Sequence, residues 1–151
     1  RALTDAGLTI ACAESCTGGL LTSFLTDVPG SSSYVMGSIV SYSNDVKARV
    51  LHVREETLSV YGAVSEETAR AMAEGVRNLM RTDIGVGITG IAGPAGGSDE
   101  KPVGLVYIAV ASNKHTVVEK NNFSGTRLEN KRAAAQKALV MISDAIRSTS
   151  R

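Results

Sequence analysis

The stretch ACAESCTGGLL, residues 11–21, decides how the chain is organised, because the structural pattern changes within it. The apolar residues that lead into it predict a buried strand over residues 8–14. After its two glycines the apolar residues recur at helical spacing, which predicts a helix over residues 17–28. Two candidate nucleophiles, Ser15 and Cys16, therefore stand where a strand gives way to a helix.

The rest of the chain continues this alternation of strands and helices. β-branched and alternating residues predict strands, apolar residues at helical spacing predict helices, and a short polar turn between two strands predicts a late hairpin. The expected strands are residues 34–42, 83–91, 103–112 and 116–124, and the expected helices are residues 1–7, 44–50, 65–81 and 128–146.

Local signals mark several of the helix ends. Gly7 suits a left-handed cap at the end of the first helix. Asn44 and Ser65 are expected to cap the helices that follow them, because their side chains can accept a hydrogen bond from a first-turn amide. The last helix is predicted to pack through one apolar stripe. The stripe consists of Leu128, Ala135, Leu139, Ile142 and Ile146.

These elements predict one domain of the α/β class over residues 1–151. Strands that alternate with helices favour a layered fold with a largely parallel sheet, and the antiparallel hairpin makes that sheet mixed. The composition changes only in the glycine- and proline-rich loop at residues 92–102, which is too short to separate two domains. Arg1 stands where an initiating Met would be, so we expect the chain to be a piece of a longer protein.

Charge and hydropathy disfavour nucleic-acid and membrane partners. The 16 Lys and Arg residues nearly balance the 15 Asp and Glu residues, and the basic residues are scattered rather than clustered. No run of aromatic residues offers a stacking platform for single-stranded nucleic acid. The longest apolar runs are far shorter than the roughly 20 residues that a membrane helix needs.

The cysteines and histidines predict neither a metal site nor disulfides. Cys12 and Cys16 are the only cysteines, and a C-x-x-x-C pair without a second pair nearby is a poor zinc signal. His52 and His115 are the only histidines, and both lie outside the loops that are rich in polar residues. We expect reduced thiols, a cytoplasmic location, and no metal or cofactor.

Three loops are candidates for a ligand site, because ligands of open α/β folds bind outside the carboxyl ends of the strands. They are residues 14–19, 41–47 and 89–97, and all three are rich in hydroxyl groups or glycine. Glycine lets backbone amides approach a ligand closely, which favours a small molecule that carries phosphate. No Walker motif and no G-x-G-x-x-G after the first strand is present, so simple turns remain the alternative explanation of the glycines.

Ser15 and Lys47 form the most interesting pair on chemical grounds. A serine hydroxyl needs a base to become a nucleophile, and a desolvated lysine whose pKa is lowered by burial can be that base. Three alternatives stay open at this point: Ser15 as a helix cap, Lys47 as a solvated helix lysine, and Cys16 as a rival nucleophile if its thiol loses a proton. The residues alone therefore predict a phosphate-accepting pocket with candidate Ser/Lys chemistry.

Five blocks of the sequence resemble the C-terminal domain of the competence/damage-inducible protein CinA, a family that includes nicotinamide mononucleotide deamidases. The blocks are AESCTGGLL, GSIVSYSNDVKARVLHV, GAVSEETARAMAEGV, ITGIAGPAGGSDEKPVGLVYIA and FSGTRLENKR, in this order. The resemblance covers about residues 7–146. It implies a three-layer α/β/α sandwich on a mixed, mostly parallel five-stranded sheet.

The resemblance also implies a reaction and roles for individual residues. The reaction is hydrolysis of nicotinamide mononucleotide to nicotinate mononucleotide and ammonia, which recycles pyridine nucleotides. The family's nucleophilic serine corresponds to Ser15, its basic lysine to Lys47, and an auxiliary tyrosine that orients groups or handles protons to Tyr42. The implied substrate-binding residues are Thr17, Gly18, Gly19, Asn44, Thr89, Gly90, Gly93 and Arg127, of which Arg127 is expected to hold the phosphate.

The resemblance also bears on the transition state and on one departure from the family pattern. The amides from Thr17 to Gly19 are expected to stabilise the oxyanion that forms when Ser15 attacks the carboxamide. The family commonly has an acid where this chain has Thr126.

The alternatives to a deamidase are a catalytically silent domain that senses nucleotides and an interaction module that serves competence or damage responses. A homo-oligomer is expected, with a pyridine mononucleotide as the small-molecule partner.

Overall fold

Five strands form one mixed sheet at the centre of the computed structural model, which describes residues 1–149. The sheet order is β2-β1-β3-β4-β5. β1 pairs in parallel with both β2 and β3, whereas β4 runs antiparallel to β3 and β5. The bounds are β1 (Ile10–Glu14), β2 (Val35–Val40), β3 (Ile84–Gly90), β4 (Leu105–Ala111) and β5 (Thr116–Asn122).

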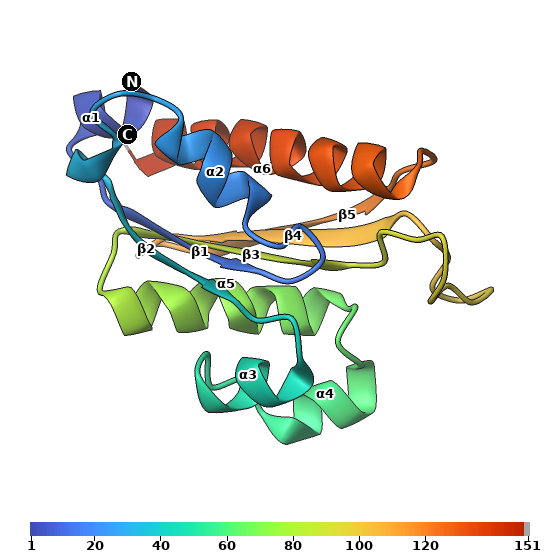
Figure 1. Cartoon of the computed structure of the whole chain (residues 1–151). Helices are drawn as coiled ribbons and strands as arrows, with labels where there is room; N and C mark the ends of the chain where they lie inside the picture. The colour runs from blue at the N-terminus through green and yellow to red at the C-terminus, as the bar shows by residue number, and fades with distance from the viewer. Residues whose placement is uncertain (150–151) are drawn as a thin grey trace.

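Helices cover both faces of this sheet, so the fold is the three-layer α/β/α sandwich that the family resemblance implies (Figure 1). One layer contains α1 (Ala2–Ala6), α2 (Leu20–Thr26) and α6 (Arg127–Thr149), with the short 3-10 helix η1 (Ser31–Ser33) at the edge. On the other face α5 (Glu66–Met80) packs against the sheet, and α3 (Asn44–Arg49) and α4 (Glu55–Tyr61) lie beyond α5, farther from the sheet. No helix described in residues 1–149 combines the length and apolarity that crossing a membrane requires.

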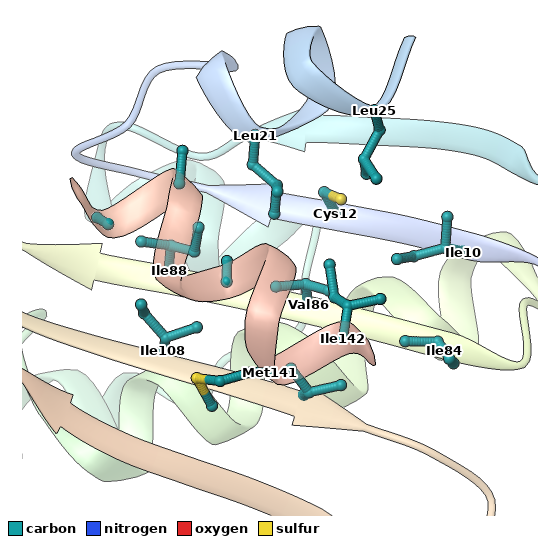
Figure 2. Close-up of a cluster of buried hydrophobic side chains, with 14 of the residues drawn as sticks. Ile10, Cys12, Leu21, Leu25, Ile84, Val86, Ile88, Ile108, Met141 and Ile142 are labelled. Carbon is teal, nitrogen blue, oxygen red and sulfur yellow. The ribbon is translucent and has the colours of Figure 1, made fainter. Parts of the chain in front are cut away.

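The two faces of β3 differ because the two helix layers approach it differently. Its large side chains, Ile84, Val86 and Ile88, point into the core beneath α2 and α6 (Figure 2). On the opposite face a Cβ at Gly85 or Gly87 would overlap the backbone of α5. The glycines of IGVGITG therefore let α5 pack directly against the middle of the sheet.

Two of the three predicted helix caps are confirmed. Gly7 adopts the left-handed conformation with φ 66° at the end of α1. The Ser65 hydroxyl accepts from the Thr68 amide at the start of α5. The expectation that Asn44 caps α3 is wrong by one residue: Ser43 accepts from the Val46 amide at 3.2 Å, and Asn44 is the first helical residue.

Other expectations are wrong in detail. α2 begins at Leu20 rather than at residue 17, because Gly18 and Gly19 both have positive φ and cannot belong to the helix. β2 ends at Val40, before Tyr42. Leu128 is 74% exposed and does not belong to the apolar stripe of α6. The sequence patterns do not predict α4, because Leu58 is its only large side chain that packs against a hydrophobic core.

Candidate active site

A pocket of about 270 Å³ lies at the carboxyl ends of β1, β2 and β3, where the three predicted loops meet. The strand ends deliver the loops there because the three strands run in the same direction. The pocket is lined by Ser15, Cys16, Tyr42, Asn44, Lys47, Ala63, Val64, Gly90, Ile91, Ala92, Gly93, Ala95, Gly96 and Arg127.

Ser15 and Lys47 are in direct contact in this pocket. The Lys47 ammonium donates to the Ser15 Oγ at 3.0 Å, although the two residues are 32 positions apart. Ser15 follows β1 directly, and Lys47 lies in the second turn of α3, which starts shortly after β2 ends. The sequence prediction that these two side chains meet is confirmed, and the two alternatives of an exposed lysine and a serine cap do not apply.

Lys47 is buried without a negatively charged partner in the part of the chain that the structure describes. Only 1% of its surface is exposed, and its Nζ donates to the backbone carbonyls of Ser41 at 2.6 Å and Tyr42 at 3.3 Å. Burial lowers the pKa of Lys47 below its ordinary value, and a thiolate at Cys16 would act in the opposite direction. The amine therefore loses its proton more readily here than in a solvated lysine.

The hydrogen bonds around Lys47 suit a general base. A neutral amine has two N–H donors and one lone pair. The two carbonyls can accept both donors, which leaves the lone pair for the third direction. That direction leads to the Ser15 Oγ. When Lys47 is neutral, the same 3.0 Å contact can carry the serine proton toward nitrogen.

Cys16 lines the pocket but has the wrong environment for a nucleophile. Its side chain packs in the core next to α2 and α6, and burial raises the pKa of its thiol to about 12. A thiolate is the reactive form of cysteine, so the protonated thiol is a weak nucleophile at neutral pH. Both cysteines are free and buried.

We expect Cys16→Ala to keep its hydrolytic rate within a few-fold of the wild type, and to lose about 1 kcal/mol of stability through reduced packing. Activity and thermal melting of the variant check both parts. A folded Cys16→Ala protein without activity would contradict the assignment and favour thiolate chemistry.

Arg127 closes the pocket from the start of α6. Its Nη1 donates to the Gly93 carbonyl at 2.8 Å, and its Nη2 donates to the Tyr42 Oη at 3.2 Å. These two hydrogen bonds connect α6 with the loop at residues 41–47 and with the glycine-rich loop at residues 89–97. The Tyr42 side chain is 63% exposed and contacts Arg127, while its backbone carbonyl contacts Lys47.

The structure brings together only part of the predicted binding set. Asn44, Gly90, Gly93 and Arg127 line the pocket with the three candidate catalytic residues. Four predicted residues do not line it. They are Thr17, Gly18, Gly19 and Thr89.

Three of those residues have structural contacts of their own. The Thr17 hydroxyl donates to Glu14, the Thr89 hydroxyl donates to the Ala63 carbonyl, and the Gly18 amide donates to the Ser15 carbonyl at 3.1 Å. The Gly18 amide is thus already used. Of the three amides expected to stabilise the oxyanion, those of Thr17 and Gly19 stay candidates.

Glu14 is a supporting residue that the sequence patterns do not reveal. Its fully buried carboxylate accepts from the Thr17 hydroxyl at 2.6 Å, from the Leu21 amide at 2.9 Å, and from both the amide and the hydroxyl of Thr22. The carboxylate therefore caps α2 in place of a residue at the helix start. Because Glu14 precedes Ser15, this network fixes the backbone that carries the candidate nucleophile.

Asn130 is a second supporting residue that was not predicted. It is buried, its Nδ2 donates to the Ala92 carbonyl, and its Oδ1 accepts from the Gly125 amide. It therefore holds the glycine-rich loop against the start of α6. A polar residue on the apolar side of a predicted helix is the signal that could have identified it.

The fold and the pocket define an α/β/α protein with a serine–lysine site, and comparison with known proteins gives its family. The CinA C-terminal domain family matches residues 1–146. The chain therefore belongs to the family of CinA C-terminal domains.

The relatives agree with this assignment. A protein of Moorella thermoacetica named as competence-damage inducible is 51% identical over 141 residues, which cover 93% of this chain and 34% of the relative. The chain thus spans about a third of the length of such relatives. The structure of the competence/damage inducible protein CihA from Agrobacterium tumefaciens is similar with a TM-score of 0.93, at 42% identity over 96% of this chain and 88% of that one. A CinA superfamily protein from Klebsiella pneumoniae 700603 gives a TM-score of 0.94, at 33% identity over 98% and 92% of the two chains.

Proposed function

We propose that this domain is an amidohydrolase that converts nicotinamide mononucleotide to nicotinate mononucleotide and ammonia. The observation that carries the proposal is the 3.0 Å contact between the Ser15 Oγ and the buried Lys47 Nζ. The charge of the pocket supports a phosphate-bearing substrate, because its charged lining residues are Lys47 and Arg127, and no Asp or Glu belongs to the lining. The sequence resemblance to the mononucleotide deamidases supports the choice of substrate.

In the first half of the reaction, Ser15 is acylated. Neutral Lys47 accepts the Ser15 proton while Oγ bonds to the carboxamide carbon, and the carbonyl oxygen becomes an oxyanion. When this intermediate collapses, the carbon–nitrogen bond breaks and the proton on Nζ passes to the leaving nitrogen. Ammonia departs, and an ester joins the nicotinoyl group to Ser15.

In the second half, water releases the acid. Lys47, neutral again, accepts a proton from the attacking water, and the ester bond to Oγ breaks. The proton on Nζ then returns to Ser15, so the two residues end in their starting states. In this proposal Arg127 holds the phosphate, and its hydrogen bond to the Tyr42 Oη links it to a second residue that lines the pocket.

Ammonia release from nicotinamide mononucleotide by the purified domain tests the proposal. We expect ammonia and nicotinate mononucleotide to appear in equal amounts. Saturable binding without ammonia would instead identify a nucleotide sensor, and neither binding nor ammonia would favour an interaction module.

For Arg127→Ala we expect the KM for the mononucleotide to rise more than kcat falls. A phosphate remote from the reacting carbon is held similarly in the ground and transition states, so its loss affects mainly binding. Initial-rate kinetics measure both constants, and Arg132→Ala, an exposed arginine on the same helix, is the control. A large fall in kcat at unchanged KM would place Arg127 in the chemistry.

A further inference from the structure

Lys131 is a partly buried cation next to the loop that carries Ser15, and it takes no part in the chemistry proposed for Ser15 and Lys47. Its Nζ lies against Gly18, where a Cβ added to the glycine would be only 3.8 Å from the ammonium nitrogen. Gly18 belongs to the turn between β1 and α2. The Lys131 ammonium therefore lies beside the backbone that leads away from the candidate nucleophile.

Lys131 has no counter-ion within residues 1–149. No hydrogen bond and no ion pair joins its ammonium to a described side chain. Lys137 on the same helix is different, because it pairs with Glu119 at 3.0 Å. Within the described residues, therefore, no protein carboxylate competes with an anionic ligand for the Lys131 ammonium.

The position of Lys131 on α6 relates it to the pocket. It lies four residues after Arg127, so the two cations share one face of the helix. Arg127 lines the pocket. The Cys16 thiol, which also lines the pocket, is close enough to Lys131 for the ammonium charge to act on its pKa. Lys131 is not among the residues that line the pocket. It lies one helical turn beyond Arg127 and extends the positive charge at that end of the pocket toward the Gly18 turn.

We propose that Lys131 and Arg127 together bind the phosphate monoester of the substrate, and that Lys131 makes the site select nucleotides over nucleosides. A phosphate monoester carries nearly two negative charges at neutral pH, since its second pKa is about 6. Arg127 supplies one positive charge, and two of its N–H groups already bind protein acceptors. Lys131 supplies the second charge. This inference rests on the proposed function for the identity of the substrate.

Equilibrium binding to Ser15→Ala protein, which removes turnover, tests the inference. Calorimetry would compare nicotinamide mononucleotide with its unphosphorylated riboside and with inorganic phosphate. In this background we expect Lys131→Met to weaken the binding of the mononucleotide and of inorganic phosphate roughly tenfold, which is the usual effect of losing a charged hydrogen bond. The affinity for the riboside should stay unchanged. Lys131→Arg should restore most of the affinity, and Lys137→Met should match the parent protein.

The outcomes separate this inference from the proposed function. Equal weakening of mononucleotide and riboside, or no weakening of either, would overturn the phosphate contact. Failure of the parent protein to bind any of the phosphate ligands would also overturn it. If wild-type protein releases no ammonia but Lys131→Met still weakens inorganic phosphate, the deamidase proposal fails while the contact stands. Melting curves establish that each variant is folded.

Discussion

Ser15→Ala is expected to lower deamidation by roughly 10⁴–10⁶-fold, as removal of a serine nucleophile does in other hydrolases. The fold should persist, because Lys47 is the one partner of the Ser15 hydroxyl among residues 1–149, and the Glu14 network holds the surrounding backbone without that hydroxyl. Affinity for the mononucleotide should change little, since the residue acts on the reacting carbon rather than on the phosphate. Ammonia release, calorimetric binding and thermal melting measure the three quantities.

The matched control is Cys16→Ala, which alters the neighbouring side chain in the same turn. A Ser15→Ala protein that keeps more than a few per cent of wild-type turnover would show that Ser15 is not the nucleophile. If Cys16→Ala were then inactive, the Cys16 thiol would become the candidate nucleophile.

Both Lys47→Met and Lys47→Arg are expected to lose nearly all activity, by roughly the 10²–10⁴-fold that general bases contribute or more. Methionine keeps an unbranched chain in the buried position but has no lone pair basic enough to accept the proton. Arginine keeps the charge, but guanidinium does not give up a proton in proteins. Lys120→Met, which removes an exposed lysine on β5, should retain wild-type rates.

The pH dependence gives Lys47 a signature that a structural lysine would lack. Only the neutral amine is active, and burial lowers its pKa from 10.5, so the rate should rise with pH through an apparent pKa below that value. Stability should also increase with pH. Between the lowered pKa and 10.5 the unfolded state binds more protons than the folded state, so the free energy of unfolding rises with pH.

Rate and melting profiles across this range test both effects. In Lys47→Met the free energy of unfolding should no longer rise with pH across this range. Any residual activity should no longer increase with pH through the apparent pKa. An active Lys47→Arg enzyme would contradict the assignment of Lys47 as the base, and so would a Lys47→Met rate that still increases with pH. Tyr42 would then be the next candidate.

The layered fold could be predicted because each of its main elements has a clear local pattern. β1 and β3 are continuous buried runs, and α5 has a capping serine, acids in its first turn and one apolar face. α4 could not be predicted in this way. Its side chains are mostly exposed, and its only local signals are Glu55 and Glu56 in the first turn and Gly62 at its end.

The pairing of Ser15 with Lys47 could be anticipated because parallel strands bring their following loops to the same edge of the sheet. The functions of the glycine loops could not, since φ angles and amide directions depend on neighbours distant in sequence. Gly18 illustrates this: its amide is used by the Ser15 carbonyl, and Lys131 on α6 lies against it. Glu14 escapes prediction for the same reason, because a carboxylate that ends a strand shows its partners only after α2 has folded over it.

Partitioning of the acyl group with hydroxylamine tests the central claim, attack of Ser15 on the carboxamide, most directly. Hydroxylamine added during turnover should divert the ester on Ser15 to the hydroxamate of the mononucleotide. We predict that hydroxamate forms at the expense of nicotinate mononucleotide while the rate of ammonia release stays the same if acylation limits turnover, and rises if deacylation does. Turnover of the mononucleotide that yields ammonia and only the free acid at every hydroxylamine concentration would contradict an acyl-enzyme on Ser15.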